Sequence, residues 1–351
     1  IVFGDWSSDV CSSDLLIGLP FSGKSSVFQA LTGIESGKKE ETVGTIKVPD
    51  ERIDKLSDIY SPKKKTYGEF VLSDFTVPPV KDNAVSPKVK NMVQKTDLLI
   101  FVLRNFDSLM TSDGTDPAVE YQKLKDELII NDFVVVERRL EREMKEKKNP
   151  PEINTLKKLS AMIEKGELPK DNKISDDEAE LVSNYNFPSM KKIIVLVNQP
   201  EGKMEIPEKL AEILKNDGVE HFCVSAPIEI ELAELSPEEQ LEFLKDYGLT
   251  ESAKIRFIKS AYHSLGLISF LTAGEDEVRA WPIRKGTTAV YAAGKIHSDI
   301  QRGFIRAETI FYDDFIKYGS ESECKKAGAY KLAGKEYVVK DGDIINFRIN
   351  V

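Results

Sequence analysis

Near the start of the chain, eight consecutive residues have the types and spacing that hold nucleotide phosphates. Gly18 and Gly23 enclose four residues and are followed by Lys24 and Ser25, in the order GLPFSGKS. The segment follows a short apolar run and precedes an expected helix, so backbone N–H groups and the positive helix end face the phosphates. We expect Lys24 to be the catalytic residue that reaches the β- and γ-phosphates, and Ser25 to offer its hydroxyl to Mg²⁺. The expected nucleotide contacts in this segment are Gly18, Leu19, Pro20, Phe21, Ser22, Gly23, Lys24, Ser25 and Ser26.

A carboxylate at the end of a neighbouring strand is needed to complete such a metal site. Asp74 lies near the end of the strand-like run Glu69–Phe75. Because Mg²⁺ is bound through oxygen ligands, we expect Asp74 to hold the metal together with Ser25. The alternative is an ordinary aspartate in a solvated turn.

The residues expected to contact the base follow two further apolar runs. GTPases carry Asn-Lys-x-Asp at the first of these places, where the Asp accepts two hydrogen bonds from guanine. Here Asn198 is followed by Gln199 in place of the Lys, and by Glu201 in place of the Asp. This arrangement should hold guanine poorly, whereas adenine presents a donor and an acceptor that an asparagine can match. We therefore predict ATP in preference to GTP, with Ser225 and Ala226 closing the base pocket.

Short apolar runs separated by helical segments predict an α/β fold with a doubly wound sheet. The predicted strands are Leu15–Gly18, Thr45–Val48, Glu69–Phe75, Asp97–Leu103, Lys191–Asn198 and Glu220–Ser225. A helix is expected from Lys24 to about Leu31, directly after the phosphate loop.

The long interval before the fifth predicted strand contains helical sequence. Apolar residues recur there every three or four positions among charged ones, which predicts one apolar helical stripe: Ile129, Phe133, Val136, Leu140 and Met144. Pro150 and Pro151 break this helix, and Leu156, Leu159 and Ile163 begin a second. We predict a helical hairpin, residues 118–189, inserted into a nucleotide-binding domain of residues 15–117 and 190–266. Two ordinary surface helices are the alternative.

From about residue 267 to residue 351, short strands, glycines and aromatic residues predict a separate α+β domain. Its basic residues between positions 279 and 306 contrast with the acidic chain as a whole, and the candidate RNA or ribosome contacts are Arg279, Lys295, Arg302 and Arg306. The aromatic or imidazole side chains between them are Trp281, Tyr291, His297 and Phe304. Such residues can hold a phosphate backbone and stack on bases. The alternative is a solvated charged face around ordinary core aromatics.

Composition limits the remaining possibilities. The chain of 351 residues has a net charge of −10, so it should repel nucleic acid and anionic membranes except at a local basic patch. Its 3 cysteines have no metal-ligand spacing, which favours a reducing cytoplasm and inert thiols at Cys223 and Cys324. No apolar run is long enough to cross a bilayer. Residues 1–14 look like a translated sequencing adapter, so we expect a non-native leader there; a genuine tail is the alternative.

The motifs together resemble the YchF-type Obg-like ATPases over nearly the whole of Leu15–Val351. Beyond the phosphate loop and Asn198–Glu201, the resemblance rests on Ala226–Leu232, Phe270–Gly274, Glu277–Trp281, Ala293–Asp299, Arg302–Ala307, Gly334–Tyr337 and Asp341–Asp343. It implies a Ras-like P-loop NTPase domain, an inserted α-helical coiled coil and a C-terminal ubiquitin-like β-grasp (TGS) domain. It also implies slow, Mg²⁺-dependent ATP hydrolysis and binding to the ribosome, at the large subunit, or to RNA through the helical and TGS domains. Neither DNA nor a membrane is expected as a partner.

The chain departs from the family in the loops that sense the γ-phosphate. Phe21 replaces an asparagine associated with monovalent-cation assistance. The first switch is shortened before Gly44–Asp50, and it leaves only Thr42 or Thr45 to replace a metal-ligating threonine. After Asp74, the family's glycine is replaced by Val77, which lacks its backbone freedom.

These departures predict a divergent branch with weakened γ-phosphate sensing. The prolines at positions 78 and 79 have no N–H group to offer a phosphate. A histidine that the family carries in the loop after residue 106 is also missing. Three hypotheses remain: a slow ATPase, a non-hydrolysing ATP sensor on the ribosome, and an RNA-binding adaptor with a vestigial nucleotide domain.

Overall fold

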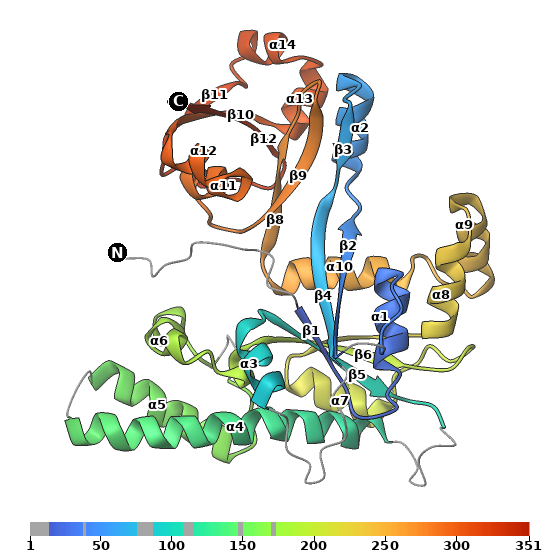
Figure 1. The fold of residues 1–351 in the computed structure, drawn as a ribbon, viewed down its shortest axis with the longest axis vertical. Helices are drawn as coiled ribbons and strands as arrows, with labels where there is room; N and C mark the ends of the chain where they lie inside the picture. Colours follow the sequence, from blue (N-terminus) through green and yellow to red (C-terminus); the bar gives the residue numbers. More distant parts are fainter. Residues whose placement is uncertain are drawn as a thin grey trace. The chain divides into compact units, whose positions relative to one another are not determined.

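The computed structural model describes residues 14–37, 40–75, 87–107, 116–146, 150–169 and 173–350. It divides into two compact units (Figure 1). The phosphate-loop unit comprises Ser13–Gly44 and Val71–Ser260, and the C-terminal unit comprises Thr45–Phe70 and Ala261–Val351. The second unit therefore includes a segment from early in the chain that was predicted to belong to the nucleotide-binding domain.

The first sheet has six strands in the order β2-β4-β1-β5-β6-β7. They are β1 (Asp14–Ile17), β2 (Glu41–Val48), β4 (Gly68–Phe75), β5 (Leu98–Arg104), β6 (Lys192–Asn198) and β7 (Glu220–Val224). β1 runs parallel to β4 and β5, and β5, β6 and β7 are parallel in turn. The predicted α/β sheet is confirmed, and its parallel strands end at one edge, where a doubly wound sheet binds its ligands.

Helices cover both faces of this sheet. They are α1 (Lys24–Thr32), α3 (Pro87–Lys95), α4 (Pro117–Glu146), α7 (Glu208–Asn216) and α8 (Ala226–Glu234). α9 (Pro237–Asp246) packs against α8, and α10 (Ala253–Ser264) follows it in the chain. α1 packs against α8 on one side, whereas α4 packs against β5 and α7 on the other (Figure 1). Buried strands such as Leu98–Arg104 are apolar almost throughout because both faces are covered.

The first strand begins one residue earlier than expected. Asp14, which was assigned to the leader, belongs to β1 and is paired with Leu72 of β4. Its side chain accepts a hydrogen bond from the backbone N–H of Leu98 over 2.9 Å, and the residue is 3% exposed. The structure therefore places Asp14 within the sheet, where its carboxylate satisfies a buried donor. The leader's other residues lie outside the described part of the chain.

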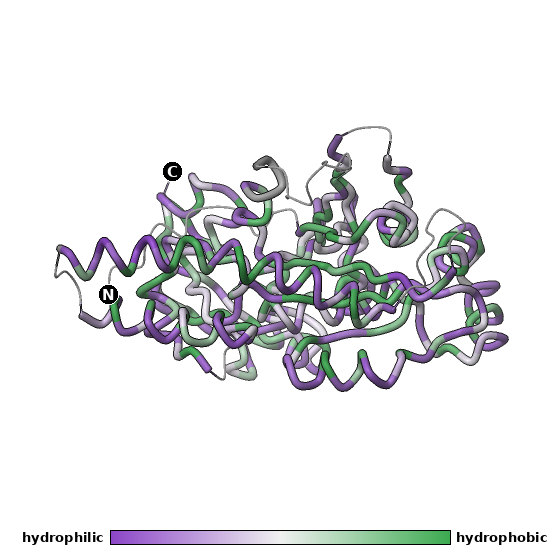
Figure 2. The backbone as a smooth tube through the Cα atoms, turned by 90° about the horizontal axis from the view of Figure 1, so that it is seen from below, coloured by the Kyte–Doolittle hydropathy of each residue, from purple (hydrophilic) through white to green (hydrophobic). Residues whose placement is uncertain are grey.

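The helical segment between β5 and β6 contains α4, α5 (Pro150–Glu164), α6 (Asp176–Val182) and the 3-10 turns η1 (Ser183–Tyr185) and η2 (Pro188–Met190). α4 packs against α5, and four residues of its predicted stripe lie in or against the core shared with the sheet. Met144 is instead 54% exposed. Pro150 and Pro151 open α5, because proline suits the first turn of a helix, where its missing N–H has no helical partner. Hydrophilic and hydrophobic stretches alternate along α4 (Figure 2).

The C-terminal unit is a mixed sheet in the order β11-β10-β12-β8-β9-β3. Its strands are β3 (Lys64–Thr66), β8 (Leu267–Thr272), β9 (Glu277–Arg284), β10 (Phe304–Phe311), β11 (Lys331–Ala333) and β12 (Asp343–Ile349). Its helices are α2 (Glu51–Tyr60), α11 (Ala289–Ile296), α12 (Ser298–Arg302), α13 (Tyr312–Tyr318) and α14 (Glu321–Lys326). β8 and β9 form an antiparallel pair, and β12 joins β8 in parallel, which gives the predicted β-grasp arrangement.

The early segment is built into this unit through both a helix and a strand. Ile53 and Leu56 of α2 are fully buried in a core with Leu271 and Phe315. β3 adds a parallel edge strand to β9, with Thr66 opposite Arg279. A second core, on the other face, packs α11 against the sheet. The same unit therefore joins residues more than two hundred positions apart in the sequence. Within the described residues, no helix combines the length and apolar character needed to span a bilayer.

Candidate functional site

The phosphate loop connects the end of β1 to the start of α1. Gly23 caps α1 with φ 80°, a backbone conformation that favours glycine. A Cβ atom on Gly23 would lie 2.1 Å from Asn198 Nδ2, and one on Gly18 would lie 2.5 Å from Ser22 Oγ. These two glycines are therefore required by close packing as well as by the turn. Their spacing leaves the loop's backbone close to the N-terminus of α1, as phosphate binding needs.

Charged and hydroxyl groups beside this loop contact the carboxylate of Asp74. Leu16 of β1 is paired with Asp74 of β4, so the carboxylate, which is 1% exposed, lies next to the start of the loop. Lys24 forms an ion pair with Asp74 and donates a hydrogen bond to the carbonyl of Phe75 over 2.6 Å. Ser25 Oγ donates to Asp74 Oδ2 over 2.9 Å. The structure therefore brings Lys24, Ser25 and Asp74 together.

One hydroxyl at this carboxylate was not expected. Ser36, in the segment after α1, donates from Oγ to Asp74 Oδ2 over 2.5 Å. Thr42 and Thr45, the hydroxyls expected in this role, both lie within β2. Nothing in the sequence distinguishes these hydroxyls, because the path of the chain between α1 and β2 decides which one reaches Asp74.

The donor set fits a magnesium ion and a phosphate chain. Ser25 and Asp74 offer hydroxyl and carboxylate oxygens, the hard ligands that Mg²⁺ takes while also binding phosphate oxygens. Ser22 is 1% exposed, and its Oγ has no hydrogen-bond partner among the described residues. This buried hydroxyl is therefore available to donate a hydrogen bond to a phosphate bound in the loop.

Asn198, at the end of β6, forms a hydrogen bond with the backbone of the phosphate loop. Its Nδ2 donates to the backbone carbonyl of Ser22 over 3.1 Å, and its Oδ1 accepts from the N–H of Ala226 over 3.4 Å. The residue is 4% exposed. Ser225 is also buried, and Ala226 begins α8. Asn198, Ser225 and Ala226 thus meet at the ends of β6 and β7, where we expected the base pocket, but the asparagine amide is engaged with the protein.

Gln199 and Glu201 have different surroundings from each other. Gln199 is 1% exposed and donates to the carbonyl of Glu205 and to the sulfur of Cys223, both over 2.7 Å. Its side chain is therefore part of the interior and does not lie in the place of a lysine stacked under a base. Glu201 is exposed and accepts a hydrogen bond from the hydroxyl of Tyr247 in α9. Burial raises the pKa of Cys223 to about 11, which agrees with an inert thiol.

Phe21 has an unusual backbone conformation for a large residue. Its φ is 66°, in the left-handed region, and it is 55% exposed. Asparagine, which the resemblance places here, adopts this region more readily than phenylalanine does. The substitution therefore introduces local strain and an exposed aromatic ring into the phosphate loop. Val77 and the two prolines after it lie outside the described residues.

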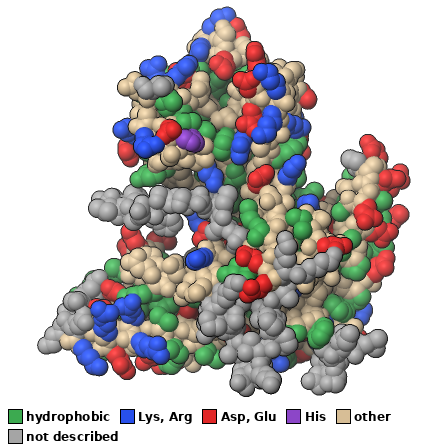
Figure 3. Space-filling model, viewed as in Figure 1, with side chains coloured by type: hydrophobic (Ala, Val, Ile, Leu, Met, Phe, Trp, Pro, Cys, Tyr) green, Lys and Arg blue, Asp and Glu red, His purple; other side chains and the backbone are tan. Residues whose placement is uncertain are grey.

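The four basic candidates of the C-terminal unit all have acidic or aromatic neighbours, or other interactions. Arg279 lies 3.9 Å from the centre of the Trp281 ring, and Arg302 forms an ion pair with Asp299. Arg306 lies 3.7 Å from Glu308, and Lys295 also has an interaction partner. Figure 3 shows Lys and Arg side chains over this unit with acidic side chains between them.

The expected base-stacking aromatics have mixed exposure. Phe304 is 6% exposed and packs in the second core, and Trp281 stacks on Phe270 with ring centres 6.2 Å apart. Tyr291 is 51% exposed, and His297 is also exposed. Phe304 is therefore a core residue, as the structural alternative predicted, whereas Tyr291 and His297 remain accessible.

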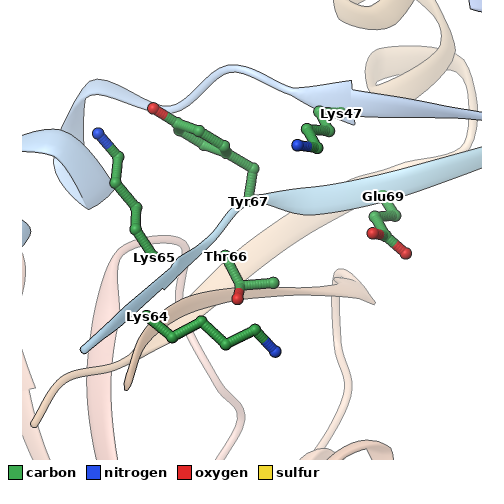
Figure 4. A pocket seen from close by; sticks show the side chains of 6 residues that line it. All are labelled: Lys47, Lys64, Lys65, Thr66, Tyr67 and Glu69. Carbon is green, nitrogen blue, oxygen red and sulfur yellow. The ribbon is translucent and has the colours of Figure 1, made fainter. Parts of the chain in front are cut away.

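A hollow in the C-terminal unit has a volume of about 420 Å³ and is lined by Lys47, Lys64, Lys65, Thr66, Tyr67 and Glu69. Side chains alternate along this strand, with Lys65 and Tyr67 on one side and Lys64 and Thr66 on the other (Figure 4). Lys65 pairs with Asp54, and Lys64 lies 3.2 Å from Glu277. None of the phosphate-loop residues lines this hollow, so it is separate from the nucleotide site.

Comparison with known proteins identifies relatives over the whole chain. A family model named YchF-GTPase_C, described as "Protein of unknown function (DUF933)", matches residues 267–350. The Ribosome-binding ATPase YchF of Bacillus subtilis (strain 168) is 36% identical over 360 residues, which cover 96% of this chain and 98% of the relative. The protein of the same name from Haemophilus ducreyi is 34% identical over 357 residues, with the same coverage. The solved structure of the Schizosaccharomyces pombe YchF GTPase has a TM-score of 0.80 and 30% identity, and covers 98% of this chain and 99% of that chain.

Proposed function

The chain belongs to the YchF family, and from this premise we propose that it is a magnesium-dependent nucleotide hydrolase that prefers ATP to GTP. We propose further that it turns ATP over slowly in the cytoplasm and that its nucleotide state controls its association with the ribosome or RNA. The observation that carries the proposal is the convergence of Lys24, Ser25 and Asp74 at the end of two parallel strands. Relatives named as ribosome-binding ATPases support the ribosome as the partner.

Catalysis in this proposal depends on position and charge. Lys24 and Asp74 neutralise each other, and ATP binding replaces this ion pair with a contact between Lys24 and the phosphates. Ser25 and Asp74 would hold Mg²⁺, which would supply neutralisation of charge on the phosphate chain. Asn198 keeps the loop in place through the carbonyl of Ser22. The protein forms no covalent bond to the substrate in this scheme.

The preference for ATP is supported by what replaces the guanine-binding residues. Glu201 takes the place of the aspartate that would accept two hydrogen bonds from guanine, and its carboxylate contacts Tyr247. Gln199 is buried, so its side chain does not pack against the face of the base. Both observations weaken a guanine site without excluding adenine. The printed names of the relatives include both ATPase and GTPase, so direct competition between the two nucleotides is the decisive comparison.

The path of the chain supports coupling between the nucleotide and the C-terminal unit. Ser36, which contacts Asp74 Oδ2, precedes residues 45–70 in the chain, and Asp74 itself follows them. Residues 45–70 belong to the C-terminal unit. We expect a shift of Ser36, or of Asp74 in β4, to displace one end of residues 45–70. The middle of that stretch is packed in the core of the C-terminal unit. Through this covalent connection, a structural change at the nucleotide site can reach a surface of the C-terminal unit that binds a partner.

Phosphate release from ATP and from GTP in Mg²⁺ tests the proposal. We expect slow release from ATP, slower release from GTP, and at least a hundredfold loss with ATP in Lys24→Ala, because Lys24 supplies charge stabilisation at the transferred phosphate. Asn216→Ala, at the end of α7 and outside the site, is the control and should retain wild-type turnover. Wild-type turnover in Lys24→Ala would contradict the assignment.

A non-hydrolysing ATP sensor on the ribosome is the second candidate. It is favoured by Phe21 in the phosphate loop, where the strained backbone and the lost asparagine reduce assistance to hydrolysis. Recovery of intact ATP in stoichiometric complex, with ribosomes present and without phosphate release, would favour the sensor over the enzyme. Measurable nucleotide affinity in either case would exclude the third hypothesis, a vestigial nucleotide domain.

A further inference from the structure

The carboxylate of Glu120 contacts the last residue of β5 in two ways. Its Oε2 accepts a hydrogen bond from the backbone N–H of Arg104 over 2.9 Å, and its Oε1 lies 3.4 Å from the guanidinium group of the same residue. Both side chains are buried, with 8% of Arg104 and 9% of Glu120 exposed. Glu120 lies in the first turn of α4, the helix that begins the helical segment between β5 and β6. One side chain of this segment therefore holds both the backbone and the side chain at the end of β5.

The residue after Arg104 forms two hydrogen bonds with the segment expected to bind the base. The backbone N–H of Asn105 donates to the carbonyl of Asn198 over 2.9 Å, and its side-chain amide donates to Gln199 Oε1 over 3.3 Å. Arg104 itself is opposite Asn198 in the parallel pairing of β5 with β6. A continuous chain of contacts therefore runs from α4, through the end of β5, to the base-binding segment.

Capping of α4 does not account for the buried carboxylate of Glu120. Asp116 already accepts a hydrogen bond from the N–H of Ala118 over 2.8 Å, so this end of the helix has a cap of its own. Burying an ion pair also costs desolvation energy that the attraction between the two charges offsets only in part, so such a pair contributes little to stability. We therefore look for its role in the geometry that it fixes, which is that of the chain at the end of β5.

We propose that Glu120 is a positioning residue for the base pocket. Through the end of β5, it holds Asn198 and Gln199 in the place needed to bind the base. The inference rests on the proposed function, because it assigns a further residue to the same nucleotide site. Glu120 contacts neither the nucleotide nor the metal in this scheme, whereas the phosphate loop takes its shape from its own glycines and from α1. Loss of Glu120 should therefore weaken binding of the base and leave binding of the phosphates unchanged.

The test uses the full-length protein with Glu120→Ala, Glu120→Gln and Asp217→Asn. Asp217 is the matched control, because it accepts hydrogen bonds from Tyr121 and Lys125 of the same helix but lies at the end of α7. Calorimetry measures the affinity for a non-hydrolysable ATP analogue in Mg²⁺. Displacement of that analogue measures the affinity for inorganic tripolyphosphate, which has phosphates but no base.

The expected effects differ between the two ligands. Glu120→Ala should weaken binding of the ATP analogue about tenfold, as expected when a buried hydrogen-bonded partner is lost. Its affinity for tripolyphosphate should not change. Glu120→Gln should be weakened less, because its amide oxygen still accepts from the N–H of Arg104, and Asp217→Asn should bind both ligands as the wild type does.

Steady-state turnover gives a second readout that a general loss of stability would not reproduce. In Glu120→Ala, KM for ATP should rise by the same factor as the dissociation constant of the analogue, and kcat should be retained. This is the pattern for a contact that is made equally in the ground state and in the transition state. A thermal melt of each variant shows whether the fold is retained, and Glu120→Gln carries the same comparison if Glu120→Ala does not fold.

The outcomes separate this inference from the proposed function. If the wild type binds the analogue and Glu120→Ala binds it equally well, the inference is overturned and the proposed function stands. The same holds if Glu120→Ala weakens both ligands equally, or if Asp217→Asn weakens the analogue as much as Glu120→Ala does, because the ion pair then only stabilises the unit. If the wild type binds no analogue in Mg²⁺, the proposed function fails and this inference fails with it.

Discussion

Polar and charged side chains have different surroundings in the two units. In the phosphate-loop unit, Asp74 is 1% exposed and Asn198 is 4% exposed, and each makes several interactions with nearby groups. In the C-terminal unit, the side chain of Arg302 is 76% exposed and that of Arg306 is 51% exposed. A buried group holds a fixed geometry because leaving it unpaired is costly, whereas an exposed ion pair is easily exchanged for another partner. The polar groups beside the phosphate loop are thus held in a fixed geometry, whereas these two arginines of the C-terminal unit can exchange partners.

The stability of the two units should also differ in origin. The phosphate-loop unit includes buried polar groups that are satisfied by hydrogen bonds, such as Asp132 with the N–H of Ser189. The C-terminal unit depends on apolar packing that includes α2, a helix from the early part of the chain. Four predictions test this contrast, from the largest expected effect to the smallest.

Removing the side chain of Leu56 should destabilise the C-terminal unit. Leu56 is fully buried in the core between α2 and the sheet, so Leu56→Ala should lower the free energy of unfolding by about 2–5 kcal/mol. Ile59→Ala, on the same helix but 48% exposed in the wild type, is the matched control and should change it by about 0.5 kcal/mol or less. Urea unfolding of both variants provides the measurement. Equal effects would mean that α2 is not held by this core.

Asp132 should make the phosphate-loop unit less stable at neutral than at acidic pH. Burial raises the pKa of Asp132 from 3.8 to about 7. The folded protein therefore binds this proton more tightly than the unfolded chain does, so the free energy of unfolding falls as pH rises from about 4 through about 7. Asp132→Asn retains an acceptor for Ser189 and should remove this slope.

The comparison for Asp132 is a set of thermal melts of wild type and Asp132→Asn between pH 4 and pH 8. The variant should gain relative stability as pH rises, by a few kcal/mol at most, because one pKa unit corresponds to about 1.4 kcal/mol. Parallel curves for the two proteins over this range would show that Asp132 is ionised at low pH in the folded state.

Relieving the backbone strain at Phe21 should stabilise the protein modestly. Phe21 has φ 66°, so Phe21→Gly should raise the free energy of unfolding by about 1 kcal/mol relative to Phe21→Ala. The alanine variant removes the ring but retains a Cβ, and it therefore isolates the backbone contribution. Chemical denaturation of the pair gives the difference, and no gain from glycine would mean that the left-handed conformation is not strained here.

The exposed basic residues should contribute to RNA binding in small, salt-dependent steps. Arg302→Ala and Arg306→Ala should each weaken binding of a single-stranded RNA oligonucleotide a few-fold and lower the salt dependence by about one counterion. Lys215→Ala, exposed at the end of α7 in the other unit, is the control. Binding curves at several salt concentrations distinguish the arginine variants from the control. A loss of RNA affinity equal to that of the control would show that these arginines do not contact the RNA.

Local sequence was sufficient to predict much of the phosphate-loop unit. The glycines, Lys24 and Ser25 specify their loop because the turn, the close approach and the helix N-terminus are all made by neighbours in sequence. Apolar runs such as Asp97–Leu103, which the structure shows as the strand Leu98–Arg104, predicted the buried strands for the same reason. The resemblance added the β-grasp fold of the C-terminal unit, which the pattern of short strands alone left open.

The prediction was weaker wherever a side chain's partner is distant in sequence. Phe304 has an aromatic side chain that could stack on a base, and Gln199 stands where GTPases carry a lysine. Only the packing around them shows that both are buried. Ser36, Thr42 and Thr45 are equivalent as hydroxyls in the sequence, and the path of the chain after α1 brings Ser36 to Asp74.

The sequence by itself determined the phosphate loop, the order of strands and helices, and the polar residues at the strand ends. These depend on short-range backbone preferences and on the period of apolar residues. Only the tertiary structure decided that α2 and β3 join the C-terminal sheet. An amphipathic helix such as Glu51–Tyr60 can bury Ile53 and Leu56 against any complementary apolar surface, and which surface it meets is fixed by packing between residues far apart in the chain.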